Sequence, residues 1–156
     1  MMEKTLVLIK PDAVQKGQIG EIISYWEKAG FKILAAKMIQ FTRTQAEEFY
    51  QVHKGKPFFE KLLNFMIAGP CMALVLAGEN VIQKNRKLMG NTNPALAEDG
   101  TVRRKFGTEG PANAVHGSDS PETANWEIHY LFTAFEILDY QHYLIDVFER
   151  IDYQDH

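Results

Sequence analysis

The chain has 156 residues, which at roughly 150 residues per domain predicts about one domain. Hydrophobic residues make up 46% of the chain and charged residues 24%, ordinary globular values that argue against a disordered chain, a collagen or a coiled coil. The net charge of −3 provides no overall positive field to grip a nucleic-acid backbone, so any anion site must be local.

The cysteine content and the apolar runs favour a cytoplasmic protein. Cys71 is the single cysteine and cannot form an intrachain disulfide, and the apolar residues 71–77 predict that its thiol is buried. The apolar stretch 6–9 is far shorter than the core of a secretory signal, and no run reaches membrane-spanning length.

Four elements are predicted in the first part of the chain. Residues 5–9 are β-favouring and apolar, which is typical of a strand buried on both faces. Residues 20–29 carry apolar side chains at steps of three and four, which predicts a helix. Residues 31–41 leave little room for a second helix and favour a strand. Thr44–Glu47 has the form of a capping box, so another helix is expected to begin there.

The middle of the chain continues with helix, strand and helix. Residues 59–67 follow the helical template until Gly69 and Pro70 end it. Residues 71–77 favour a strand, and residues 80–89 place apolar side chains on one helical face.

A long loop is expected over residues 91–113, which show no sustained period and include a basic run at 103–105. Loops of this length inside a compact domain are usually functional or disordered, and function is the better interpretation here. Residues 113–116 suggest a short last strand. Ser120 then caps a helix that reaches about Phe132.

This order predicts an α+β fold, a ferredoxin-like βαββαβ antiparallel sheet with helices packed on one face. The main domain is expected over residues 1–140, followed by a C-terminal helical extension over 141–156. An apolar stripe at helical spacing supports the extension and consists of Ile137, Tyr140, Leu144, Val147, Phe148 and Ile151. This helix packs either on its own domain or on a neighbouring subunit.

Several common catalytic motifs are missing. Tyr50 and Pro57 stand where a P-loop would need its first glycine and its Ser or Thr. His116, Ser118 and Asp119 are too close in sequence to be taken as a relay, and no Gly-x-Ser-x-Gly elbow is present. No two histidines have zincin spacing, so a structural metal is not expected.

Three segments, at residues 10–12, 90–94 and 113–120, together resemble the motifs of a known enzyme family. With the string His-Gly-Ser-Asp-Ser at 116–120, the sequence closely resembles nucleoside diphosphate kinases from about Lys4 to Tyr140. The resemblance implies transfer of the terminal phosphoryl of a nucleoside triphosphate, usually ATP, to an enzyme histidine and then to a nucleoside diphosphate. This ping-pong reaction maintains nucleoside triphosphate pools.

The resemblance also implies the roles of the reacting residues. His116 matches the nucleophile, and a neutral imidazole suits that role near pH 7. Glu127 is expected to accept a hydrogen bond from the other ring nitrogen with support from Ser118, and Tyr50 to be a packing and hydrogen-bond neighbour of the histidine.

Further positions match the nucleotide site. Lys10, Arg86 and Arg103 match phosphate-binding cations. Thr92 resembles a hydroxyl contact to phosphate, and Asn113 a contact to sugar or phosphate.

Phe58 matches the aromatic residue on which the base stacks. Stacking without contacts to the base edge tolerates every base. The opposite face usually carries an aliphatic residue, but Gly110 stands there, so a looser grip is expected to raise KM rather than lower kcat. Magnesium is expected to arrive with the nucleotide phosphates, with Asp119 as the candidate protein ligand.

Two other classes of protein compete with an enzyme: a ferredoxin-like module that binds nucleotide without transfer, and an oligomeric scaffold. A binding module would be expected to have lost His116 or the cations, and neither is lost. Family members assemble as hexamers or tetramers, and the sequence does not choose between these homo-oligomers.

Overall fold

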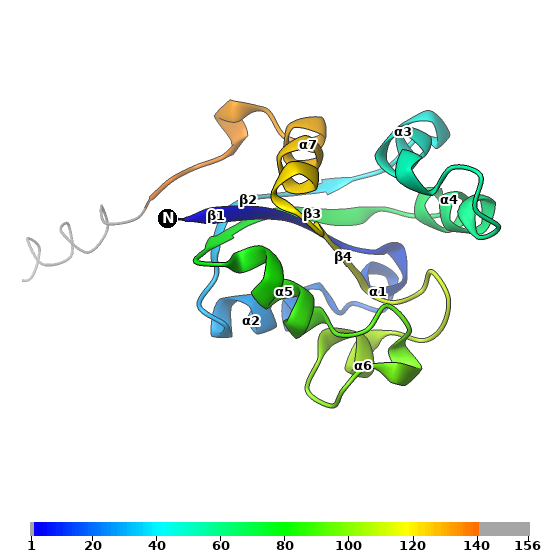
Figure 1. Cartoon of the computed structure of the whole chain (residues 1–156), viewed down its shortest axis with the longest axis horizontal. Coiled ribbons are helices and arrows are strands. Elements are labelled where there is room, and N and C mark those ends of the chain that lie inside the picture. The colour runs from blue at the N-terminus through cyan, green and yellow to red at the C-terminus, as the bar shows by residue number, and fades with distance from the viewer. Residues whose placement is uncertain (1, 141–156) are drawn as a thin grey trace, which may run out of the picture.

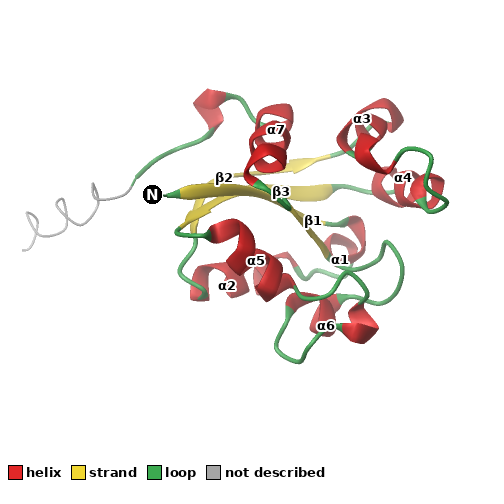
Figure 2. Cartoon of the chain, in the orientation of Figure 1, coloured by secondary structure: helices red, strands yellow, loops and turns green. Residues whose placement is uncertain are grey.

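The computed structural model describes residues 2–140, which form one antiparallel sheet with helices on both sides (Figures 1 and 2). The strands are β1 (Glu3–Ile9), β2 (Lys32–Ile39), β3 (Cys71–Gly78) and β4 (Val115–Gly117). The helices are α1 (Pro11–Gln15), α2 (Ile19–Lys28), α3 (Arg43–Phe49), α4 (Phe59–Ile67), α5 (Val81–Met89), α6 (Val102–Phe106) and α7 (Pro121–Leu131). Short 3-10 turns lie at Gln51–His53, Pro94–Leu96 and Ala134–Glu136.

The sheet has the strand order β2-β3-β1-β4, and each neighbouring pair is antiparallel. This is the predicted ferredoxin-like βαββαβ arrangement, which is confirmed. The central position of β1 follows from its composition, because residues 6–9 are completely buried and therefore need cover on both faces.

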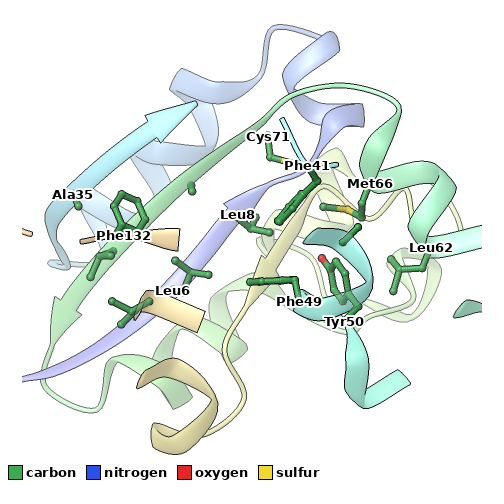
Figure 3. Close-up of a cluster of buried hydrophobic side chains, with 14 of the residues drawn as sticks. Leu6, Leu8, Ala35, Phe41, Phe49, Tyr50, Leu62, Met66, Cys71 and Phe132 are labelled. Atoms are coloured by element: carbon green, nitrogen blue, oxygen red, sulfur yellow. The ribbon is translucent and has the colours of Figure 1, made fainter. Parts of the chain in front are cut away.

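Two apolar layers cover the sheet, so the predicted placement of helices on one face is wrong. Leu6 and Leu8 point into a layer under α3, α4 and α7, while Val7 and Ile9 point into a layer with α2, α5 and α6. Figure 3 shows the first layer, with Phe49 on the same side of the sheet as Leu8. The physical reason is the alternation of side chains along a strand: an all-apolar strand buries both of its faces only between two helical layers.

A buried polar pair stands inside the second layer. Trp26 of α2 donates its indole N–H to the side-chain oxygen of Asn85 on α5, at 2.8 Å, and both side chains are completely buried. The amide nitrogen of Asn85 lies 3.5 Å from the sulfur of Met89. A Cβ on Gly117 would come within 2.6 Å of both side chains, so the last residue of β4 must be glycine for α5 to pack this closely.

The start of α3 differs from the prediction. The capping box uses Thr42 and Gln45 rather than Thr44 and Glu47, and the helix begins at Arg43. Both pairs have the required spacing, but only the first puts the buried Phe41 just before the cap, where it packs in the same layer as Ala46. This apolar contact across the cap selects one of two equivalent sequence patterns.

The predicted loop over residues 91–113 is wrong in part, because it contains the short turn at Pro94–Leu96 and the helix α6. The side chain of Thr101 accepts the backbone N–H of Arg104 and so caps α6. Both α6 and the unpredicted α1 are five residues long, too short to produce a periodic pattern.

Residues 137–140, where the apolar stripe of the C-terminal segment begins, are not helical. Leu138 donates its backbone N–H to the carbonyl oxygen of Leu34 at 2.9 Å, and the hydroxyl of Tyr140 donates to the carbonyl oxygen of Ile33 at 2.8 Å. Residues 137–140 therefore pass beside β2. The predicted extension at 141–156 lies outside the described residues.

Across residues 2–140, none of the helices combines the length and the apolar character that a membrane span requires.

The Trp26–Asn85 hydrogen bond gives a test of this packing. Replacing Asn85 with Ala leaves a buried indole N–H unpaired, and we expect a loss of about 1–3 kcal/mol in the free energy of unfolding. The double variant Trp26→Phe/Asn85→Ala is expected to lose less than the sum of the single variants, because it removes the unpaired donor. Urea unfolding measures both, with Lys84→Ala on the exposed side of α5 as the control. Strict additivity would contradict the coupling.

Candidate functional site

The candidate site lies where β1 ends beside β4. In the pairing of these strands, His116 lies opposite Leu8. Leu8 precedes Lys10 by two residues in the sequence. The backbone N–H of Lys10 donates to the carbonyl oxygen of Ala114 at 2.8 Å. The sheet therefore brings together two residues that are more than 100 positions apart in the sequence.

A buried carboxylate holds the imidazole of His116. Its Nε2 lies 3.0 Å and 3.1 Å from the two carboxylate oxygens of Glu127 on α7, whose side chain is 5% exposed. Ser118 donates its hydroxyl to the same carboxylate at 2.6 Å and accepts the backbone N–H of Leu6 at 3.2 Å. Because a carboxylate only accepts hydrogen bonds, Nε2 carries the hydrogen and Nδ1 keeps the lone pair.

Aromatic rings pack around the histidine. The ring centroids of Phe49 and Tyr50 lie 5.2 Å and 5.7 Å from that of His116, both edge-on. Among the described residues the buried hydroxyl of Tyr50 has no hydrogen-bond partner, so the packing predicted for this residue is present but the hydrogen bond is not. Burial raises the pKa of Tyr50 well above its ordinary value, so the phenol remains protonated and can donate.

A cavity of about 250 Å³ lies beside the histidine strand and is lined by Arg86, Met89, Gly90, Asn91, Thr92 and Arg103. Arg103 of α6 donates to the carbonyl oxygens of Gly90 at 3.0 Å and Val115 at 2.9 Å. Val115 directly precedes His116. Arg103 thus joins the end of α5 to the strand that carries the histidine.

The cations of the site are crowded and poorly hydrated. Burial, and secondly the charge of Arg103, lower the pKa of Lys10 to about 8. Burial, and secondly the charge of Arg86, lower the pKa of Arg103 to about 10. These shifts mark a place where positive charge is held at a cost and where an anion would be stabilised.

Asn113 connects Lys10 to the cavity. The ammonium of Lys10 donates to the side-chain oxygen of Asn113 at 2.8 Å, and the amide of Asn113 donates to the carbonyl oxygen of Thr92 at 3.0 Å. The side chain of Thr92 is exposed at the cavity wall. These three expected site residues are therefore brought together with Arg86 and Arg103.

Phe58 lies farther out, at the start of α4, and 48% of its surface is exposed. Its ring centroid is 5.3 Å from that of His53, which is stacked 6.3 Å from Tyr50, the neighbour of His116. A continuous row of rings thus connects the exposed aromatic residue to the histidine.

Sequence reasoning missed two residues of this region. The sequence assigns no role to His53, which lies between Phe58 and Tyr50 in the row of rings. Burial, together with the charges of Lys56 and His116, lowers the pKa of His53. Asp12 accepts the backbone N–H of Ala114 at 3.1 Å and so holds this residue at a φ of 72°. The positions of His53 and Asp12 along the chain gave no indication of these contacts, because the contacts form only when distant segments pack together.

Two comparisons of sequence place the chain among known proteins. The sequence model described as nucleoside diphosphate kinase matches residues 3–137. A nucleoside diphosphate kinase of Francisella philomiragia is 57% identical over 136 residues, covering 87% of this chain and 97% of the relative. The nucleoside diphosphate kinase of Desulfosudis oleivorans is 54% identical over 137 residues, covering 88% of this chain and 99% of the relative.

Solved structures agree with these relatives. The Aquifex aeolicus nucleoside diphosphate kinase superposes with a TM-score of 0.86 at 43% identity, covering 88% of this chain and all of that one. The Halobacterium salinarum nucleoside diphosphate kinase, solved in complex with CDP, gives a TM-score of 0.87 at 36% identity, covering 90% and 94%. The chain belongs to the nucleoside diphosphate kinase family.

Proposed function

We propose that this protein is a nucleoside diphosphate kinase that works through a phosphohistidine on His116. The observation that carries the proposal is the hydrogen bond from Nε2 of His116 to the buried carboxylate of Glu127, beside a cavity lined by cations. It leaves Nδ1 as the nitrogen that can attack. Family membership supports nucleoside triphosphates and diphosphates as the substrates.

In the first half-reaction, the lone pair of Nδ1 forms a bond to the terminal phosphorus. The bond from that phosphorus to its bridging oxygen breaks, and the nucleoside diphosphate leaves with the bond electrons. The imidazole becomes positively charged, and the carboxylate of Glu127 stabilises it through the Nε2 hydrogen. The second half-reaction reverses these steps with another diphosphate.

The remaining site residues bind and orient the phosphates. Lys10, Arg86 and Arg103 offset the charge on the phosphoryl oxygens, which is the main catalytic need of such a transfer. Arg103 offers a planar fork of donors, whereas Lys10 offers a compact charge. Thr92 and Asn113 supply further polar contacts to phosphate or sugar.

Phe58 provides the surface on which the base stacks, and its exposure supports this role. Gly110 offers no side chain to the other face of the base. We therefore propose broad base tolerance with a loose grip, expressed in KM more than in kcat.

We propose Mg²⁺ as the metal that arrives with the nucleotide. Within residues 2–140, no three His, Cys, Asp or Glu side chains are grouped closely enough to hold a metal ion, which fits an ion that is bound mainly by the substrate's phosphates. The exposed carboxylate of Asp119 is the candidate protein ligand. When bound, the ion would neutralise phosphate charge.

Replacing His116 with Ala tests the nucleophile. Intact mass after mixing with ATP and magnesium should increase by one phosphoryl group in the unchanged protein, and the group should be lost on adding a nucleoside diphosphate. The variant should show neither step because it lacks the attacking nitrogen. His129→Ala, an exposed histidine on α7, should behave like the unchanged protein. A mass gain that persists in His116→Ala would assign the nucleophile elsewhere.

Glu127→Gln tests the partner of the imidazole. The amide has nearly the same shape but no charge, so it stabilises the imidazolium poorly. We expect kcat to fall by about 10- to 100-fold, the size of a hydrogen bond to a charged group, while nucleotide affinity stays close to normal. Stopped-flow measurement of phosphoenzyme formation checks this, with Glu122→Gln in the first turn of α7 as the matched control. Equal rates in the two variants would rule out the role of Glu127.

The pKa of Lys10 predicts a pH dependence of binding. With a pKa of about 8, Lys10 is charged below pH 8 and loses its proton above it. Nucleoside diphosphate affinity should therefore weaken above pH 8 by up to about tenfold per pH unit. Calorimetric titration between pH 6.5 and 9.5 measures this change, and Lys10→Met should bind weakly with no such dependence. A break that remains in Lys10→Met would assign it to another group.

Homo-oligomeric assembly as a hexamer or tetramer, a cytoplasmic location and the separate C-terminal extension stay predictions from the sequence.

A further inference from the structure

Lys61 lies against the opening that Gly110 leaves in the candidate base site. Gly110 has a φ of +57°, a conformation that side chains rarely adopt, and the loop offers no side chain there. The ammonium nitrogen of Lys61 lies 3.8 Å from the point that a Cβ on Gly110 would occupy. A flexible cation from α4 thus lies next to the gap.

Lys61 and Phe58 belong to the same surface. They are three residues apart at the start of α4, a spacing that puts two side chains on one side of a helix. Both are exposed. A base held between Phe58 and the loop at Gly110 would therefore lie beside the Lys61 side chain, whose flexible stem lets the ammonium group reach the edge of the base.

The loop opposite Lys61 also connects to the phosphate end of the site. Pro111, the residue after Gly110, accepts a hydrogen bond from the ammonium of Lys10 at 3.3 Å through its carbonyl oxygen. The two lysines therefore lie by consecutive residues of one loop. Lys10 is buried among the phosphate-binding groups, whereas Lys61 is exposed, farther out.

We propose that Lys61 selects among bases by donating a hydrogen bond to a carbonyl oxygen at the base edge. This inference rests on the proposed function, in which the base stacks on Phe58. An ammonium group can only donate hydrogen bonds. Guanine and hypoxanthine present a carbonyl oxygen at C6, and uracil presents one at C4, whereas adenine and cytosine present an amino group that also donates. Lys61 therefore favours oxo bases over amino bases.

A general electrostatic role for Lys61 makes a different prediction. A cation near the polyphosphate would attract all nucleotides to the same extent, because every nucleoside diphosphate carries the same phosphates. Selection by the base edge instead changes the ratio between two diphosphates that differ at C6. The ratio of kcat/KM values for inosine and adenosine diphosphates separates the two roles.

The experiment measures the reaction of the phosphorylated enzyme with inosine diphosphate and with adenosine diphosphate, in the unchanged protein and in Lys61→Met. We expect the unchanged protein to favour inosine diphosphate by about three- to tenfold in kcat/KM, the size of one hydrogen bond exposed to water. In Lys61→Met the ratio should fall toward one, mainly through KM for inosine diphosphate. Lys61→Arg should keep the preference, and Lys84→Met, an exposed lysine on α5, should leave the ratio unchanged.

The outcomes separate this inference from the function on which it rests. If phosphoenzyme forms normally but the ratio of kcat/KM values for the two diphosphates is the same in the unchanged protein and in Lys61→Met, only the role of Lys61 is overturned. An equal loss of kcat/KM for both diphosphates in Lys61→Met also overturns this role, in favour of a general electrostatic attraction. Failure of the unchanged protein to form phosphoenzyme overturns the proposed function itself.

Discussion

The pairing of β1 with β4 is the interaction on which the site depends. Strand β4 has only three residues, and the buried residues 7–9 of β1 hold it at the edge of the sheet. Strand β1 also binds Ser118 through Leu6 and ends one residue before Lys10. One element therefore positions both the hydroxyl that supports the Glu127 carboxylate and one of the cations. A short strand at a sheet edge has little stability of its own, and here the contacts that stabilise it also build the site.

The site holds more positive charge than its surroundings accommodate easily. Lys10 and Arg103 both lose water on burial. Arg103 also repels Lys10, and Arg86 repels Arg103, so burial and repulsion both lower the two pKa values. Arg103 uses two donors on backbone carbonyls, while its Nε has no partner within the described part of the chain. A polyphosphate would relieve this repulsion, so the charge arrangement that destabilises the empty site would strengthen binding and stabilise a transferring phosphoryl group.

Sequence patterns predicted the elements that are long and regular. Strands β1 and β3 and helix α4 were found because a continuous apolar run bounded by turn residues is typical of a buried strand, and a repeat at helical spacing is typical of a helix. Helix α6 was missed because five residues cannot show a period. The position of the capping box depended on Phe41, whose burial is a tertiary contact, and the two helical layers followed from the burial of both faces of β1.

The sequence by itself determined the family and the order of the strands and longer helices, because motifs and periodic patterns carry that information. The chemistry expected at His116, Glu127 and Lys10 followed from the resemblance to that family. Only the tertiary structure decided that Nδ1 keeps the lone pair and that the Tyr50 hydroxyl lies without a partner among the described residues. It alone also put Lys61 beside Gly110. Such facts depend on which side chains meet after distant segments pack, and no spacing along a chain specifies distances of a few ångströms between them.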